Sequence, residues 1–572
     1  MDRQRIAKRR RDDDDRLSKL GDGVLGHILS FLDTKEAARA AALSSRWRDI
    51  FASVHTVSLE EPEKPIPDYD SDGGYYDPNP PPHFTRVVTM AITARSSPPF
   101  PNAASVPLRT LRVAMESYNG GDASTVDHWV SRALKDAAPE LQVHLRLRRV
   151  PVCRRPDPSH DAASSDEDHA AGSDEDVPLC SRPDAGSSDE DHAAGSDEDV
   201  PLAHEDDDAA SSSDESVPRP WELPPAVYTV PSQLFSCSAL RSLRLGSCRL
   251  CPPATVSLPS LEVLRLTHVG DEEEHLQRLI SACPHLADLT LEACGTNTMT
   301  ALSLLDNTRL RRLALRCCHK LAAVTVHASE LRCFEYRGTI PDNSFLTVPG
   351  RDAGGGFPSV TSCKIEVCTV CVAQNTAMSQ EQLAKLGSFL ELFVSTKQLH
   401  LCAAHMSSCF VNLPAFPSLT HLQLDGCVRH DSNDPVAVAT TTITILQRVP
   451  NLEVLTMFFE AGPHEAELEE YPLHKEGELL DAHHLHYNQY DTLDLATVPV
   501  PRCLGSKVRR ISLVHYQGGR AQRMLARFLL RNAPLLEKLF CELAEGPLWI
   551  QTELVREMET WVMNERASKV FV

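Results

Sequence analysis

One short pattern of apolar positions, L-x-x-L-x-L, recurs along most of the chain. Its first residue falls on Leu108 and, beyond residue 220, on Leu240, Leu261, Leu286, Leu310, Leu331, Leu419 and Leu452. Inside each copy apolar and polar residues alternate, which is typical of a strand with one buried face. The four starts from Leu240 to Leu310 lie 21, 25 and 24 residues apart. A unit this small cannot bury its own apolar face, so neighbouring copies must stack to form a core.

The period and the residues that follow each motif resemble leucine-rich repeats. A cysteine stands three residues after the last apolar position in four copies, at Cys248, Cys294, Cys318 and Cys427. This is the Asn/Cys position of the repeat, where a side chain bonds the backbone of the turn. Residues 271–281 and 380–394 carry apolar positions at helical spacing, which predicts helices on the convex side. The register fails at 340–360 and 461–490, which predicts loops there and an irregular array.

Residues 17–51 predict three short amphipathic helices. The first has one apolar stripe, formed by Leu20, Val24, Leu25, Ile28, Leu29 and Leu32. Asp33 can cap the second helix, since Glu36 follows three residues later. Ser44 or Ser45 can cap the third, whose apolar positions are Leu43, Trp47, Ile50 and Phe51. Such a module is too small for a deep core, so we expect another protein to cover its apolar face; a bundle that packs only on this chain is the alternative.

Three motifs of this module resemble the plant F-box in order and spacing: DRLSKL at 15–20, ILSFL at 28–32 and LSSRWR at 43–48. The resemblance implies that the helices bind a Skp-family adaptor and so join a cullin–RING ubiquitin ligase. It assigns the adaptor contact, or its immediate support, to Leu20, Leu25, Ile28, Leu29, Leu32, Leu43 and Trp47, with Trp47 as the anchor. Gly21 stands where the family usually has proline, which removes a preset φ and modestly loosens the helix start.

The C-terminal region resembles the FBD segment that closes many plant F-box/leucine-rich-repeat proteins. VPVPRCL at 498–504 leads into apolar positions, a Gly518-Gly519 pair and a helical pattern, and RASKVFV occupies 566–572. The apolar residues involved are Val508, Ile511, Leu513, Met524, Leu525, Phe528 and Leu529. We expect this segment to cover the open edge of the last repeat, which would otherwise invite pairing with another strand.

The formal charge of −22 is concentrated in one segment. Between Asp157 and Ser216 there are 21 acidic residues and one basic residue, which leaves 79 − 21 = 58 acids against 57 − 1 = 56 bases elsewhere. The segment contains a perfect duplication, SSDEDHAAGSDEDVPL at 164–179 and 187–202. Dense like charge with few apolar residues predicts disorder. We interpret it as an inert acidic insertion, although its serines suit an acid-directed kinase. The near-neutral remainder gives no indication of nucleic-acid binding.

No apolar run approaches the ~20 residues that a membrane span needs, and no hydrophobic stretch follows the charged N-terminus. With 18 cysteines and no secretory signal, we expect reduced thiols and a location in the nucleus, the cytoplasm or both. The basic cluster Lys8-Arg9-Arg10-Arg11 is compatible with nuclear import.

Possible metal ligands occur at Cys248-x-x-Cys251, at Cys368-x-x-Cys371 and at His483-His484-x-His486 with Asp481. Cys248 is already explained as a repeat residue, and nothing in the sequence fixes the geometry of the histidines. No nucleophile elbow, phosphate-binding loop, dinucleotide fingerprint or zinc-protease motif is present. We therefore predict no metal, no cofactor and no catalytic residues.

We predict an α/β chain in which an N-terminal three-helix F-box precedes an irregular leucine-rich-repeat solenoid (horseshoe) with a disordered acidic insertion. The predicted segments are a basic and acidic leader at 1–15, the F-box at 16–60, a Pro/Gly/Asp-rich loop at 61–83, first repeat units at 84–153, the insertion at 154–219, the solenoid at 220–490 and the FBD-like segment and cap at 491–572.

The predicted function is that of a non-catalytic substrate-recognition subunit of a Skp–cullin–F-box (SCF) E3 ubiquitin ligase. The F-box would bind the Skp-family adaptor, and the repeats would hold a target protein near the conjugating enzyme, where proximity alone promotes transfer. A ligase-independent scaffold and a small-molecule-sensing receptor are alternatives. The sensor needs a basic pocket on the inner face of the repeats, for which the candidates are Arg241, Arg244, Arg265, Arg311 and Arg312.

Overall fold

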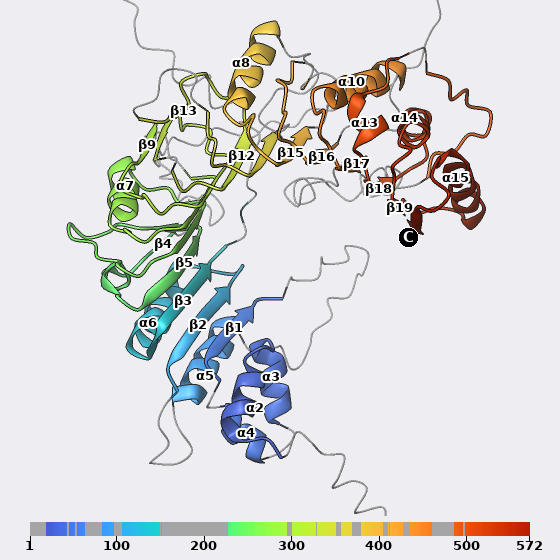
Figure 1. Cartoon of the computed structure of the whole chain (residues 1–572). Coiled ribbons are helices and arrows are strands. Elements are labelled where there is room, and N and C mark those ends of the chain that lie inside the picture. The colour runs from blue at the N-terminus through green and yellow to red at the C-terminus, as the bar shows by residue number, and fades with distance from the viewer. Residues whose placement is uncertain are drawn as a thin grey trace, which may run out of the picture. The chain divides into compact units, whose positions relative to one another are not determined.

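The computed structural model describes residues 19–42, 45–51, 54–62, 83–96, 106–148, 150, 227–294, 300–327, 329–349, 356–368, 379–403, 410, 412–426, 435–459, 485–495 and 498–572 (Figure 1). The chain divides into two compact units, one formed by 1–155 with 226–572 and the other by 156–225. All described residues belong to the first unit. The predicted acidic insertion, the basic leader and most of the loop at 61–83 lie outside the described residues, so the expectation of disorder stays a prediction.

Among the described residues, one parallel sheet of 15 strands contains all the predicted motifs. Its strands follow one another in space in the order in which they occur in the chain. They are β1 (Thr56–Glu60), β2 (Leu108–Ala114), β3 (Ala137–Arg146), β5 (Leu240–Gly246), β7 (Val263–Thr267), β8 (Asp288–Glu292), β10 (Arg312–Arg316), β12 (Cys333–Gly338), β14 (Ser362–Val367), β15 (Gln398–Ala403), β16 (His421–Asp425), β17 (Val454–Phe458), β18 (Arg510–Tyr516), β19 (Lys538–Leu543) and β20 (Ser568–Phe571).

The leucines of the motifs form continuous rows across this sheet. Leu243 of β5 is in register with Leu264 of β7, which pairs in turn with Leu289 of β8, and all three are fully buried. A second row, two residues further along each strand, begins at Leu245 and is buried in the same way. Each strand therefore completes its apolar surface only against its neighbours. β3 and β5 pair directly although residues 154–219 separate them, so the insertion leaves these rows uninterrupted.

Helices lie along one side of the sheet (Figure 1), and their buried apolar side chains share one core with the leucine rows. They are α5 (Phe84–Ser96), α6 (Ala123–Lys135), α7 (Glu273–Ser281), α8 (Gln380–Glu391), α10 (Pro435–Gln447), α13 (Arg502–Ser506), α14 (Arg520–Arg531) and α15 (Leu548–Trp561), with 3-10 turns η1 (Gly120–Asp122) and η2 (Ser232–Ser236). α7 and α8 confirm the helices predicted at 271–281 and 380–394. Ser379 caps α8, accepting a hydrogen bond from the Gln382 backbone N–H.

Two small sheets lie beside the main one. β9 (Ala301–Leu304), β11 (Ala323–Val326) and β13 (Leu346–Thr347) form the first, and β4 (Tyr228–Thr229) pairs with β6 (Cys248–Arg249) in the second. β13 falls inside the 340–360 range that was predicted as loop. That part of the prediction is wrong, because two residues that pair with β11 are too few to produce a readable alternation in the sequence.

The N-terminal helices α2 (Asp22–Leu29), α3 (Thr34–Ala41) and α4 (Ser45–Phe51) have a small core of their own. Its buried residues are Leu25, Leu29, Ala37, Ile50 and Val54. The Asp33 carboxylate caps α3 by accepting a hydrogen bond of 2.7 Å from the Glu36 backbone N–H, which confirms the predicted cap. The helices also contact the edge strand β1, where the Ser58 N–H donates to Thr34 Oγ1 over 2.7 Å. They therefore satisfy backbone groups at an edge that would otherwise be open.

The FBD-like segment extends the repeat sheet. Its strand β18 pairs with β17, and β19 and β20 follow in the same parallel order. Behind them the guanidinium of Arg523 is almost fully buried and donates to both carboxylate oxygens of Glu557, over 3.0 and 2.6 Å. The same group donates to the Asn488 carbonyl and lies 4.7 Å from the centre of the Tyr487 ring. One arginine thus ties α14, α15 and residues 487–491 together.

We expect Arg523→Ala to lower the free energy of unfolding by about 3–5 kcal/mol, because it leaves Glu557 partly buried without its partner. The control is Arg527→Ala in the same helix, whose partner Asp494 is largely exposed; it should cost less than about 1 kcal/mol. Urea denaturation of both variants checks this. Equal losses in the two variants would contradict a special role for the buried pair.

Candidate functional site

The first helix carries two neighbouring apolar stripes where the sequence suggested one. Leu25 and Leu29 face the small core and are buried, whereas Val24 and Phe31 are 50% and 77% exposed. Leu32 lies next to Phe31 and is 38% exposed. The residues at i, i+4 and i+7 from Val24 form a stripe as good as the one from Leu25, so periodicity alone could not show which stripe is buried.

The predicted adaptor-contact residues therefore occupy three kinds of position. Leu25 and Leu29 support the helices from within, and Leu20, Ile28 and Trp47 are half-buried at the rim of that core. Leu32 is on the surface. Leu43 lies outside the described residues. Phe31, which was not among the predicted contact residues, lies in the turn after α2 and is the most exposed of the large apolar side chains described in this N-terminal module.

The start of α2 depends on Gly21 and Arg46. Gly21 is the N-cap residue, with φ −68° and no side-chain hydrogen bond, and a Cβ there would meet nothing within 4 Å. Arg46 from α4 donates to the Leu20 carbonyl over 2.6 Å and to Asp22 Oδ1 over 2.9 Å. The backbone at Gly21 thus already has the φ that proline would impose.

We expect Gly21→Pro to raise stability by about 0.4–1 kcal/mol, because proline removes unfolded-state freedom without changing the native φ. Hydrogen exchange of the α2 amides is the measurement, and protection should increase. Gly26→Pro, in the middle of the same helix, should instead cost about 3 kcal/mol and abolish that protection. A loss of protection in Gly21→Pro would show that the helix start cannot accept the ring.

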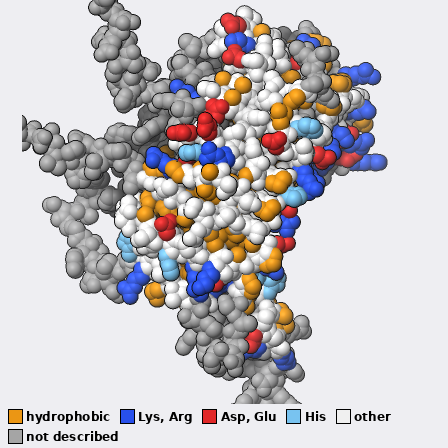
Figure 2. All heavy atoms as spheres, turned by 90° about the vertical axis from the view of Figure 1, so that its left-hand side faces the viewer, with side chains coloured by type: hydrophobic (Ala, Val, Ile, Leu, Met, Phe, Trp, Pro, Cys, Tyr) orange, Lys and Arg blue, Asp and Glu red, His pale blue; other side chains and the backbone are white. Residues whose placement is uncertain are grey.

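A second candidate surface is the polar face, defined here by the strand side chains that alternate with the leucine rows. Strand alternation directs these side chains away from the packed helices. The central row of the polar face runs through Arg112, His144, Arg244, Arg265, Thr290, Ala314, Glu335, Lys364, His400, Gln423 and Thr456. The side of the molecule that carries α6 and α7 instead mixes apolar, acidic and basic side chains (Figure 2).

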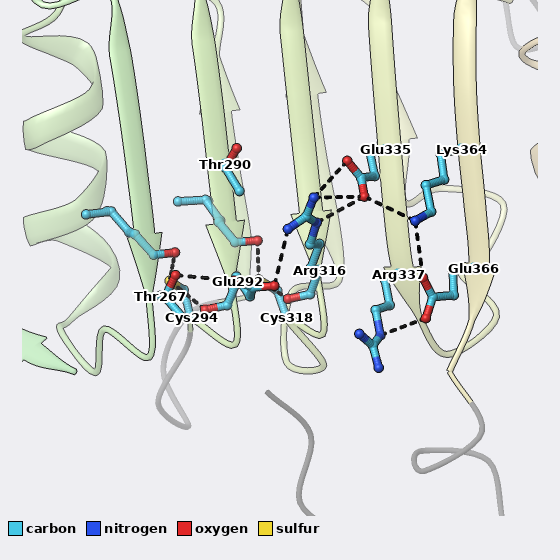
Figure 3. Close-up of polar contacts among 12 residues, drawn as sticks. Thr267, Thr290, Glu292, Cys294, Arg316, Cys318, Glu335, Arg337, Lys364 and Glu366 are labelled. Atoms are coloured by element: carbon cyan, nitrogen blue, oxygen red, sulfur yellow. Dashed lines mark hydrogen bonds and ion pairs between the residues drawn. The ribbon is translucent and has the colours of Figure 1, made fainter. Parts of the chain in front are cut away.

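An ion-pair network crosses the middle of the polar face (Figure 3). Arg316 donates to both oxygens of Glu335, over 3.0 and 3.1 Å, and to Glu292 over 3.4 Å. Lys364 lies 3.9 Å from Glu335 and 3.8 Å from Glu366. Burial would raise the pKa of Glu335, but the hydrogen bonds and charge of Arg316, with Lys364 and Arg312, outweigh it and lower the pKa. The network therefore holds its side chains in fixed positions before any partner binds.

We expect Glu335→Gln to destabilise the protein by roughly 1–3 kcal/mol at neutral pH, less than for a fully buried pair because solvent reaches the network. Since the folded-state pKa of Glu335 is lowered, its contribution is present above the unfolded pKa and is lost as the pH falls through the folded value. The denaturation curves of variant and wild type should therefore differ at neutral pH and converge at acid pH. Glu262→Gln, at an exposed pair with Arg241, is the control and should lose much less.

Two hollows open on the polar face. The central hollow, of about 410 Å³, is lined by residues that include Arg312, Glu335, Lys364, His400 and Gln423. The basic hollow, of about 380 Å³, is lined by His144, Arg146, Arg148, Val150, Arg244, Leu245, Gly246, Ser247, Arg265, Thr267, His268, Thr290, Glu292 and Arg316. Of the arginines named from the sequence, Arg244 and Arg265 line the basic hollow and Arg312 the central one. Arg241 pairs with Glu140 and Glu262, and Arg311 is exposed.

Two repeat cysteines bond backbone carbonyls. Cys294 donates to the Leu266 carbonyl over 3.2 Å and Cys318 to the Leu291 carbonyl over 3.6 Å, so each thiol bonds the backbone as predicted, but in the strand of the preceding repeat and not in the turn. Burial raises the pKa of Cys294 to about 11, so its thiol stays protonated and unreactive. Cys427, Cys371, His483, His484 and Asp481 lie outside the described residues. Cys248 is buried and Cys251 exposed.

Three segments of the chain match families of known proteins. Residues 17–58 match the F-box domain, residues 215–343 match the family described as FBD-associated F-box protein At5g56370, LRR repeats, and residues 498–540 match FBD. No helix within the described residues has the length and apolar character to cross a membrane. The chain thus carries F-box, leucine-rich-repeat and FBD domains, as its motifs predicted.

The chain is also similar to individual proteins of Arabidopsis thaliana. It is 22% identical to F-box/LRR-repeat protein At2g42730 over 569 residues, which cover 97% of this chain and 96% of that protein. It is 23% identical to FBD-associated F-box protein At5g22730 over 348 residues, 57% of this chain and 66% of the relative. F-box/LRR-repeat protein At2g42720 is 52% identical, but over 46 residues, 8% and 10% of the two chains. An F-box implies binding to a Skp-family protein, and the repeats imply binding to a protein substrate.

Proposed function

We propose that this chain is the substrate-recognition subunit of a Skp–cullin–F-box ubiquitin ligase in the nucleus, the cytoplasm or both. The observation that carries the proposal is the exposed apolar stripe formed by Val24 of α2 with Phe31 and Leu32 of the turn that follows it, within the segment that matches the F-box. Exposed aromatic and aliphatic side chains are typical anchors of protein interfaces. The Skp-family adaptor would cover this stripe, with Leu25, Leu29 and the half-buried Trp47 supporting it from behind.

The repeats supply the surface for a target protein. In the proposed architecture they form an irregular solenoid, a horseshoe whose inner face is the polar face. Its ion-pair network and two hollows provide fixed hydrogen-bonding groups for a partner. Because Thr34 and Lys35 of α3 hydrogen-bond the backbone of β1, the adaptor end and the first repeat strand are joined by direct contacts. The chain needs no catalytic group, since holding a target lysine near the conjugating enzyme raises its effective concentration.

We expect the double variant Phe31→Asp with Leu32→Asp to weaken capture of a purified Skp-family adaptor by at least about 30-fold, a loss of about 2 kcal/mol. Trp47→Ala should also weaken capture, through the packing behind the stripe. The control is Leu535→Asp with Leu548→Asp, which places the same two charges on exposed leucines outside the N-terminal helices. Circular dichroism confirms that each variant is folded.

Undiminished adaptor capture by the double variant would contradict this assignment of the stripe. Co-purification of a cullin with the intact chain separates a ligase subunit from a scaffold, because a scaffold would bring the target without the cullin. Blocking cullin activity during purification would trap targets that are otherwise degraded.

A further inference from the structure

The basic hollow carries positive charge that its own surroundings do not neutralise. Arg244 and Arg148 form no ion pair with any residue that the structure describes. Arg265 reaches Asp288 at 3.4 Å, and Glu292, the acidic residue in the lining, is engaged by Arg316. The balance of positive and negative charge therefore differs from that of the central hollow, where Glu335 pairs with Arg312 and Lys364.

Unsatisfied hydrogen-bonding atoms occur in the same place. The Nε atoms of Arg146 and Arg265 and Nε2 of His268 are buried and have no hydrogen-bond partner among the described residues. Unpartnered buried polar atoms are uncommon because each costs free energy, so three in one lining are notable. One terminal nitrogen of Arg146, Nη2, does pair, with Glu60 and Glu116 at 2.9 Å each. The cationic groups of the hollow are thus only partly compensated.

The titration behaviour of the lining agrees with this geometry. Burial lowers the pKa of His144 to about 4, and the charges of Arg112, Arg244 and Arg146 act in the same direction, against Glu60. Burial and the nearby charge of Arg265 also lower the pKa of Arg244. Burial is the largest cause for both groups, and neighbouring arginine charges add to it, opposed at Arg244 by Asp288; a bound anion would favour the charged form of Arg244.

The arginines of the central row are spread along the sheet, over four adjacent strands that also carry the neutral His144. Arg112, His144, Arg244 and Arg265 are successive members of the central row, on β2, β3, β5 and β7. Neighbouring strands lie about 4.8 Å apart, so these four positions span roughly 14 Å. An anion with charges distributed along its length matches this row better than a single small ion.

We infer that the basic hollow binds an acidic polypeptide segment of the target protein, with negative charge supplied by clustered Asp and Glu or by phosphorylated side chains. This inference rests on the proposed function, in which the polar face receives the target. Arg244 and Arg265 contact the anionic groups, and Arg148 at the exposed rim attracts the segment as it approaches. Arg146 adds positive potential beneath them.

The test is fluorescence anisotropy with the full chain and a labelled peptide rich in Asp and Glu. A matched peptide with Asn and Gln at those positions, a phosphoserine version and free inorganic phosphate complete the set of ligands. We expect the acidic or the phosphorylated peptide to bind, the neutral one to bind at least tenfold more weakly, and affinity to fall as salt is raised.

Arg244→Gln with Arg265→Gln should weaken peptide binding at least tenfold and flatten its salt dependence. Arg241→Gln with Arg509→Gln removes the same charge at two exposed pairs outside both hollows and should change binding less than twofold. A double lysine variant at Arg244 and Arg265 retains the charge and should retain most of the binding, which guards against loss through misfolding.

Equal affinity for acidic and neutral peptides, or no effect of the Arg244/Arg265 glutamine pair, would overturn the inference. Binding of inorganic phosphate without either anionic peptide would also overturn it, in favour of a small-anion site. Adaptor capture measured on the same samples separates the two proposals. If wild type captures the adaptor but binds no anionic peptide, only the proposed peptide binding by the basic hollow is refuted. If wild type binds the peptide but captures no adaptor, only the ligase assignment is refuted.

Discussion

Burial of leucine between neighbouring parallel strands is the interaction on which the rest of this structure depends. Each motif supplies two apolar side chains that are fully covered only when the strands on both sides are in register, as Leu264 is between Leu243 and Leu289. The helices pack on these rows, and the polar face exists because the alternate residues must point the other way. Both hollows and the ion-pair network are consequences of that register.

Two parts of the chain with different chemistry use this frame. The N-terminal helices present a small apolar stripe at the edge strand β1, whereas the polar face presents fixed charges. Hydrophobic contact suits a permanent partner such as an adaptor, and charge complementarity suits the selection of one target among many. Because Arg316 and Glu335 hold each other in place, the middle of the polar face gains order without a ligand.

Local patterns predicted the elements well, because their causes are local. The motif starts, the Asp33 cap, α7, α8 and the repeat cysteines all follow from spacing along one segment. The exposure of Phe31 does not follow from local spacing. The stripes that begin at Val24 and Leu25 are equally apolar, and only the packing of α4 decides which of them is buried. From the sequence alone Arg523 would be assigned to the surface. In the structure it is buried by contacts with Glu557 and Asn488, which are more than 30 residues away in the chain. The basic hollow likewise needs His144 beside Arg244, which the sequence separates by the acidic insertion.

Because spatial order equals chain order, the sheet would set the distance between adaptor and target in the proposed ligase assembly. Every additional strand displaces whatever is bound beyond it by a fixed step of about 4.8 Å. Gain or loss of a single unit during gene duplication would therefore shift a captured protein by that step relative to the incoming ubiquitin, and would bring a different set of lysines within range while leaving the chemistry of capture unchanged.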